Sequence, residues 1–314
     1  MYLMKNGLKG ACLALLMGGI SGCSGDKPLD SPSRGTITVA VDESFKPLAM
    51  QLTDAYSGIY PDTHFELKYR PERESIAMLL KDSARLAFTT RPLTRQEQIA
   101  FDQQKIIGKA EKIGTDGVAL IVSKNNRDSL ITMAELKAVF SGQLTQWQQL
   151  KGATETGPIT LVFDNNNSSN LDFVLRTFSI TDVSKLRIFT THSNKEVIEY
   201  VRKNPTALGF IGVNWISDGD SPLSGELSAD MRVLGVSDKD NPTSIKDYYQ
   251  PFQRNLGLQT YPLRRPVYIL SRETHPGLGG GLINYIARDA GSLLIEKLGL
   301  WPVKPYNREV YIRK

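Results

Sequence analysis

The sequence contains few residues of the kinds that carry out catalysis or hold metals. Its 314 residues include two cysteines and three histidines, and no histidine lies at metal-ligand spacing from another histidine or from a cysteine. A G-x-S-x-G segment, the nucleophile motif of many hydrolases, is missing from the sequence. We therefore predict that the protein is not an enzyme and that it holds no metal or cofactor.

Both cysteines lie near the N-terminus. Residues 1–22 contain two lysines, no acid and a short apolar run, which is typical of a secretory signal and too short to span a bilayer. The run ends in Ile20-Ser21-Gly22-Cys23, which resembles a bacterial lipobox, where the cysteine becomes the lipidated first residue. We predict a lipoprotein signal peptide at residues 1–22, lipidation of Cys23 and a flexible tether over residues 23–34. The alternative is an ordinary secretory signal.

The remaining chain has no cysteine, so its own core must stabilise it outside the cell. A chain of this length buries about three quarters of its unfolded surface, usually in more than one lobe. The formal net charge of +5 is mild. The basic residues form no block and no stripe interleaved with aromatic residues, which argues against nucleic acid as a partner.

Short β-branched runs alternate with amphipathic stretches, which predicts an α/β fold with largely parallel sheets. The chain opens as βαβαβ, the beginning of a doubly wound fold. We expect strands at residues 36–41, 64–69, 85–89, 117–123, 159–163, 207–213 and 267–271. We expect helices at residues 45–60, 75–82, 132–141, 167–178, 195–204 and 281–298.

This pattern predicts two lobes. Residues 35–114 and 261–314 would form lobe I, and residues 115–260 would form lobe II. The chain then crosses between the lobes twice, which suits a hinge.

Several stretches carry a family resemblance. Asp42-Glu43-Ser44-Phe45 leads into a helix, residues 136–147 end a helix at Phe-Ser-Gly before a tryptophan, and residues 204–212 read NPTALGFIG. Their order and spacing, together with those of residues 75–93, 116–122 and 261–268, resemble the substrate-binding proteins of phosphate ABC transporters, the PstS type. The resemblance covers nearly all of the chain after the signal.

The resemblance implies a type II periplasmic-binding fold with a ligand between two lobes. Helix N-termini suit such an anion, because their free N–H groups and the helix dipole favour negative charge. Phosphate or a related oxyanion is the implied ligand, and an ABC permease is the implied partner. The implied contacts are Ser44, Phe45, Glu74, Ser75, Thr89, Thr90, Ser168, Ser169 and Asn170. The alternative role of each serine or threonine is a helix N-cap.

Two departures from the family pattern concern charge. Thr90 stands where phosphate binders carry an aspartate that accepts the ligand's proton, and Asp164 stands where the family carries an arginine. An unpaired buried carboxylate beside a dianion is costly. Arg91 offers a compensation, because it can enter the cleft and either pair with Asp164 or bind the anion itself. Alternatively, Asp164 braces a turn and Arg91 lies on the surface.

The sequence thus supports an extracytoplasmic, lipid-anchored solute-binding protein for ABC-type uptake or sensing. The alternative is the same fold used as an envelope lipoprotein that binds another ligand or a protein, which the acids Glu72, Glu74 and Asp164 favour. A hydrolase of phosphorylated material is a third hypothesis, for which we find no nucleophile–base pair. Residues 277–281 are glycine-rich but lack the Lys-Ser/Thr of a phosphate loop, which predicts a simple loop-to-helix joint.

Overall fold

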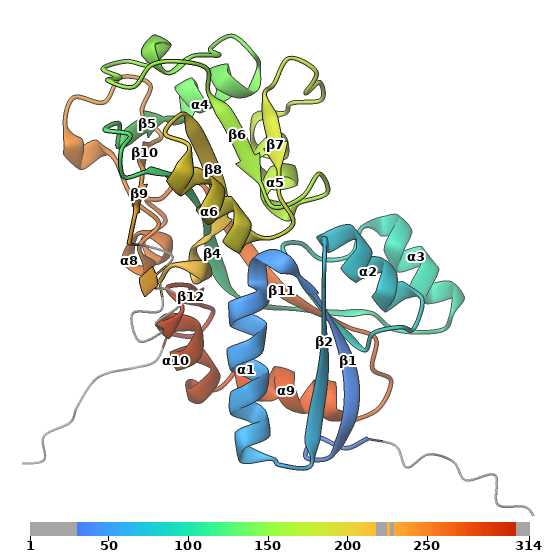
Figure 1. Ribbon diagram of the computed structural model, residues 1–314. Helices are drawn as coiled ribbons and strands as arrows, with labels where there is room; N and C mark the ends of the chain where they lie inside the picture. Colours follow the sequence, from blue (N-terminus) through green and yellow to red (C-terminus); the bar gives the residue numbers. More distant parts are fainter. Residues whose placement is uncertain (1–29, 218–224, 227–228, 306–314) are drawn as a thin grey trace, which may run out of the picture.

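The computed structural model describes residues 30–217, 225–226 and 229–305 (Figure 1). The predicted signal peptide, Cys23 and the first part of the tether lie outside these residues, as does most of the loop expected at residues 217–225.

One large sheet runs through the molecule, with ten strands in the order β2-β1-β3-β11-β4-β8-β6-β7 and with β12 and β9 also paired to β4. Strands β1, β2 and β3 are parallel, as are β6, β7 and β8, whereas β4 is antiparallel to both β11 and β8. The strands are β1 Gly35–Asp42, β2 Thr63–Arg70, β3 Leu86–Thr89, β4 Lys109–Ser123, β6 Thr160–Phe163, β7 Ile188–Thr190, β8 Ala207–Gly212, β9 Met231–Val233, β11 Arg264–Ser271 and β12 Trp301–Pro302. Strands β5, Leu130–Thr132, and β10, Gly235–Ser237, form a separate small sheet.

The helices are distributed along the whole chain. Their bounds are η1 Glu43–Phe45, α1 Lys46–Ile59, α2 Glu72–Leu80, α3 Arg95–Gln103, α4 Met133–Phe140, η2 Trp147–Gln149, α5 Ser169–Phe178, α6 Asn194–Lys203, η3 Val213–Trp215, η4 Ile245–Asp247, α8 Gln253–Gly257, α9 Leu278–Ile286 and α10 Asp289–Lys297.

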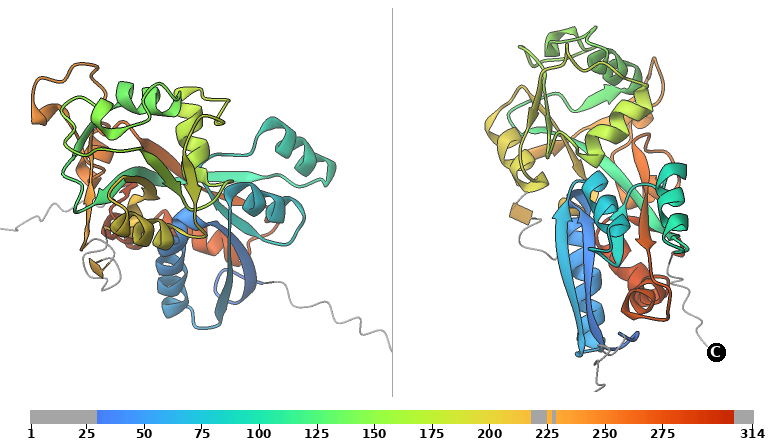
Figure 2. Two further views of the ribbon diagram at one scale, coloured as in Figure 1. Left: turned by 45° about the horizontal axis from the view of Figure 1, so that its top comes forward. Right: turned by 90° about the vertical axis from the view of Figure 1, so that its right-hand side faces the viewer.

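Strand β4 joins two lobes, and the fold is the two-lobed type II periplasmic-binding fold. Its first half pairs with β11 and β12, and its second half pairs with β8 and β9. The first lobe contains β1 to β3 with α1, α2, α3 and α9. The second lobe contains β6 to β8 with α4, α5 and α6 (Figure 1). Figure 2 shows the two lobes one above the other, with β4 and β11 passing between them.

The first lobe is doubly wound because alternate residues of β1 face opposite sides of the sheet. Val39 and Val41 belong to the apolar cluster that includes helices α1 and α9. Ala40, between them, packs in a second cluster with Ile76 of α2 and Phe101 of α3. Both faces of the strand are therefore buried, as its continuous β-branched run predicts.

The second lobe has an aromatic core. The rings of Phe163 in β6 and Phe210 in β8 stack with centroids 4.5 Å apart, and Phe140 of α4 meets Phe210 edge-on at 5.6 Å. Burying each such ring contributes about 1.5–3 kcal/mol. This packing fixes β6 and β8 side by side and so places the loops that follow both strands.

Most expected elements form, and three differences stand out. Helix α2 begins at Glu72 rather than Ser75, because Pro71 has an extended backbone that suits the residue before a helix. The helix expected at residues 281–298 is two helices, α9 and α10. Helix α3 was not among the predicted helices, although Thr94 and Glu97 form a reciprocal capping box at its start. A box of the same kind, between Thr132 and Glu135, begins α4.

The first described residues, 30–34, are attached to the first lobe. Within its described residues, the carboxylate of Asp30 accepts the N–H of Leu278 at 2.6 Å and lies 3.2 Å from the ring of His275. The Tyr56 hydroxyl donates to the carbonyl of Pro32 at 2.5 Å. The prediction of a flexible tether is therefore wrong for residues 30–34, because these side chains bind them to α1 and to the start of α9.

Candidate functional site

The loop after β1 collects polar contacts from both lobes. The N–H and the hydroxyl of Ser44 donate to Asp42 Oδ1 at 2.9 and 2.5 Å. The Ser169 hydroxyl, at the start of α5 in the second lobe, donates to the same oxygen at 2.9 Å. All three residues are buried. A single carboxylate oxygen therefore receives donors from two lobes.

Arg265 of β11 lies beside this oxygen and is fully buried. Its Nε donates to Asp116 Oδ2 at 3.0 Å, and its Nη2 forms an ion pair with the same oxygen at 2.9 Å. Its Nη1 donates to Ser169 Oγ at 3.1 Å, and its Nη2 donates to Ser44 Oγ at 2.9 Å. The guanidinium sits over the Phe45 ring, 5.0 Å from the centroid. A buried arginine is tolerated because its donors are satisfied and its charge is paired.

A second polar group adjoins the first. The Ser168 hydroxyl and the Asn170 amide donate to Asp164 Oδ1 at 2.5 and 3.2 Å. Glu43, from the first lobe, accepts the backbone N–H of Asn194 at 3.0 Å and also accepts its side-chain amide. The Asn170 amide also donates to Asn194 Oδ1 at 3.3 Å, so the five residues form one network across the lobes.

The turn η3, which follows β8, supplies further contacts between the lobes. The side-chain N–H groups of Asn214 and Trp215 donate to the carbonyl of Ser44 at 2.9 and 3.1 Å. Within the described chain, the carbonyl oxygens of the Asn170 and Asn214 side chains are buried without a hydrogen-bond partner. Such orphaned acceptors are uncommon and suit a ligand that brings a donor.

The site contains more acid than base. Burial raises the pKa of Glu43 to about 8, and the nearby charge of Asp164 adds to the rise. Burial also raises the pKa of Asp42 and of Asp164, although Arg265 opposes both shifts. Carboxyls of this kind hold protons more readily than exposed ones, so the site can present O–H donors as well as acceptors.

Thr90 and Arg91 have a different environment from the one expected. The N–H and hydroxyl of Thr90 donate to Glu72 Oε1, the hydroxyl at 2.7 Å. Arg91 binds the carboxylate of Glu97 through two nitrogens at 2.8 and 2.9 Å and lies 3.8 Å from Glu72. Of the alternatives considered for Arg91, the pairing with Asp164 does not form, because Glu97 of the unpredicted helix α3 provides a closer partner.

The structure brings together Ser44, Phe45, Asp164, Ser168, Ser169 and Asn170, as expected. It does not bring Glu74, Ser75 or Thr89 into this network. Glu74 is exposed, and the N–H groups of Glu74 and Ser75 already donate to the carbonyl of Pro71 inside α2. The Thr89 hydroxyl donates to the carbonyl of Arg91 at 2.8 Å and so closes a turn.

Five residues of the network had no assigned role in the sequence analysis: Asp42, Glu43, Asp116, Asn194 and Arg265. Asp42 ends β1, Asn194 starts α6, and Asp116 and Arg265 face each other on paired strands. A sequence signal that could have identified the charged members is their position beside long apolar strands, because burial forces a charged residue to pair with a polar or oppositely charged group.

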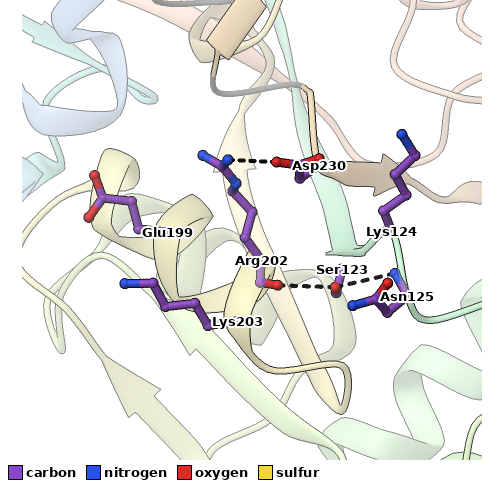
Figure 3. Close-up of a pocket in the computed structure, with 7 residues that line it drawn as sticks. All are labelled: Ser123, Lys124, Asn125, Glu199, Arg202, Lys203 and Asp230. Atoms are coloured by element: carbon purple, nitrogen blue, oxygen red, sulfur yellow. Dashed lines mark hydrogen bonds and ion pairs between the residues drawn. The ribbon is translucent and has the colours of Figure 1, made fainter.

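A cavity of about 520 Å³ lies away from this network, between the end of β4 and the last turn of α6. Arg202 pairs there with Asp230 at 2.7 Å, and the Ser123 hydroxyl donates to the carbonyl of Arg202 at 3.2 Å (Figure 3). Lys124 and Lys203 extend in different directions in Figure 3 and do not converge on a common point. This cavity is not a good candidate for the main site, because the Arg202–Asp230 pair that lines it is already satisfied within the protein.

In the part of the chain that the structure describes, no helix has the length and apolar character needed to cross a membrane. Nor do histidine, cysteine, aspartate and glutamate side chains gather there in a group able to hold a metal ion.

The chain is similar to proteins of known type. A family model described as a PBP superfamily domain matches residues 27–290. The phosphate-binding protein PstS of Staphylococcus epidermidis is 22% identical over 271 residues, covering 85% of this chain and 75% of that protein. The corresponding protein of Staphylococcus aureus strain USA300 is 22% identical over 270 residues, covering 85% and 74%.

Solved structures share the fold. A phosphate ABC transporter substrate-binding protein from Clostridium perfringens, solved with bound phosphate, has a TM-score of 0.70 at 20% identity and covers 86% of this chain and all of its own. An ABC-type phosphate transport receptor from Vibrio cholerae has a TM-score of 0.61 at 22% identity, covering 85% and 100%. At this level of identity the likeness shows the fold.

Proposed function

The chain belongs to the PBP superfamily, and on that premise we propose that it is an extracytoplasmic solute-binding protein. It captures a small oxyanion, phosphate or a relative, between its two lobes and serves ABC-type uptake or sensing. The phosphate-binding relatives support this ligand class. The expected role is binding without turnover.

One observation carries the proposal. The hydroxyls of Ser44 and Ser169 come from opposite lobes, lie 3.2 Å apart and are both bound by Arg265. Both hydroxyls donate to Asp42 in this structure, and an oxyanion that replaced Asp42 as their acceptor would receive a donor set of two hydroxyls beside a buried guanidinium. An oxyanion bound to this set would contact both lobes at once, which is how a closing protein gains affinity from its ligand.

The acids determine which oxyanion fits. Asp42 and Asp164 lie beside the donors, and a fully deprotonated dianion would be repelled by their carboxylates. An oxyanion that carries protons can donate to the Asp164 carboxylate and to the orphaned Asn170 oxygen. Glu72, held by Thr90, supplies a further acceptor on the first lobe. We therefore expect phosphate to be preferred over sulfate.

The test is calorimetric titration of the full chain carrying Cys23→Ser, with phosphate and with sulfate. We expect micromolar or tighter phosphate binding, weaker binding of sulfate, and a loss of at least tenfold in phosphate affinity in Ser169→Ala. Ser141→Ala, an exposed serine at the end of α4, is the matched control and should bind as the parent does. No heat with either anion would refute the oxyanion assignment and leave only the fold.

We propose, further, that Cys23 is lipidated after removal of residues 1–22, that residues 23–29 span the gap to the membrane, and that the lobes divide near residues 114 and 260. The signal-like N-terminal sequence supports the anchor. Metabolic labelling with a radioactive fatty acid in a bacterial host should label the parent and not Cys23→Ser. Equal labelling of both would contradict the anchor.

A further inference from the structure

A second cavity, of about 410 Å³, lies behind the hinge; we call it the hinge pocket. Thr115 of β4 lies in its wall and pairs with Pro266 of β11 on one side and with Trp301 of β12 on the other. Because side chains alternate along a strand, Thr115 and Arg264 face this pocket while Asp116 and Arg265 face the network between the lobes. Arg265 also lines the pocket, but its guanidinium binds Asp116, Ser44 and Ser169 in the network, so the polar groups of the two sites lie on opposite faces of the same strand pair.

The hinge pocket has an aromatic wall. The Trp301 indole packs flat against Gly257, where an added Cβ would lie 2.6 Å from the ring. This close approach fixes the indole, which remains partly exposed to the cavity. Leu256 and Pro302 add apolar surface beside it. A fixed, half-exposed indole is a good stacking surface for a flat ring.

The hinge pocket is also basic. Lys112 and Arg264 both line it, and none of its lining residues is acidic. Arg264 is held in place by the carbonyls of Gln259 and Tyr261, at 2.8 and 3.0 Å. Lys112 forms no ion pair with any residue in the described part of the chain. Two cations in a pocket whose lining contains no acid attract and orient an acidic group.

We propose that the hinge pocket binds a small organic anion whose acidic group is attached to a flat unsaturated ring. The ring stacks on Trp301, and the acidic group lies between Lys112 and Arg264. The volume falls within the range of about 300–1,000 Å³ typical of small-molecule sites. A bare inorganic anion would leave the indole wall unused, and an uncharged ring would leave both cations unpaired. The proposal does not depend on the ligand that binds between the lobes.

The probe for the test is 8-anilinonaphthalene-1-sulfonate, an aromatic sulfonate, titrated into the full chain carrying Cys23→Ser in phosphate-free buffer. Calorimetry gives the stoichiometry and fluorescence gives the affinity. We expect one probe per chain with micromolar affinity. Naphthalene-1-sulfonate should displace it, whereas methanesulfonate, which has the acid and lacks the ring, should not at the same concentration.

Variants locate the site. Lys112→Glu, at an exposed side chain, should lower the affinity for the probe at least tenfold, and Trp301→Leu should lower it by a similar factor. The melting temperature of each variant is recorded as a check on folding. Lys124→Glu makes the same charge change at an exposed lysine outside the pocket and should leave the affinity unchanged. Equal affinity in the parent and in Lys112→Glu, or binding of several probes per chain that neither variant reduces, would overturn the proposal.

Discussion

Glu43 and Asn194 connect the two lobes through a paired contact, since the carboxylate accepts both the backbone N–H, at 3.0 Å, and the side-chain amide of Asn194. It lies at the edge of the network, whereas Asp42 and Ser169 form the contact between the lobes at its centre. The lobes are thus held together by polar groups that titrate, and their association should depend on pH.

Glu43→Gln tests this dependence. Burial raises the pKa of Glu43 from 4.5 to about 8, so the folded state holds a proton that the unfolded state releases. The stabilisation from this group is complete below pH 4.5 and is lost as the pH rises through 8, at no more than about 1.4 kcal/mol per pH unit. The melting temperature of the parent should fall between pH 5 and pH 8. The melting temperature of Glu43→Gln should fall less over this range, because glutamine keeps an acceptor for Asn194 and does not titrate.

Glu66→Gln provides the control, because Glu66 is exposed and its carboxylate has a weak 3.6 Å pair with Lys68. The melting temperature of this variant should change with pH as that of the parent does. A parent melting temperature that rises from pH 5 to pH 8 would contradict the assigned direction.

Asp42→Asn tests the role of the central carboxylate. Asparagine retains an oxygen that accepts from Ser44 and removes a negative charge next to the proposed ligand. Phosphate affinity at pH 8 should increase by about tenfold, which corresponds to about 1.4 kcal/mol. The gain should be smaller at pH 5, because burial raises the pKa of Asp42 and the parent carboxyl is then more protonated. Weaker phosphate binding in Asp42→Asn would instead show that the carboxylate accepts a proton from the ligand.

The fold was predictable because its signals are local. The apolar run of β4 and the capping box at Thr132 depend only on neighbouring residues. The pairing of Arg265 with Asp116 is different, because it joins residues 149 positions apart and requires β11 to lie between β3 and β4. No local sequence pattern predicts that β11 lies between β3 and β4. Only the family resemblance indicated that the segment containing Arg265 returns to the first lobe.

The site was predictable in part for the same reason. Ser168 and Ser169 follow a strand and begin a helix, which is visible in the sequence. Glu74 and Ser75 were predicted at a helix start, but the helix begins two to three residues earlier, and their N–H groups point into it. An error of two or three residues in a helix boundary changes which backbone N–H groups are predicted to be free at the helix terminus. Those free N–H groups are the ones that an anion binds.

Asp30→Ala tests the attachment of the segment before β1. The Asp30 carboxylate accepts the N–H of Leu278 and so caps a helix whose own first residues offer no side-chain cap. Loss of such a cap costs about 0.5–2 kcal/mol. We expect a lower melting temperature and faster proteolytic cleavage near residue 30. Asp54→Ala, an exposed position within α1, should change neither. Unchanged cleavage in Asp30→Ala would show that Pro32 and Tyr56 suffice to hold the segment.

Arg265→Met tests whether the buried ion pair organises the site. The single variant leaves Asp116 buried without its cation, and burial already raises the pKa of that carboxyl against the pull of Arg265. Breaking a buried pair from one side costs about 3–5 kcal/mol. The double variant Arg265→Met, Asp116→Asn removes both charges and should regain much of that stability in a urea titration. It should still fail to bind phosphate, because Ser44 and Ser169 have lost the guanidinium that lies between them. A double variant that recovers both stability and phosphate binding would show that Arg265 serves the fold alone.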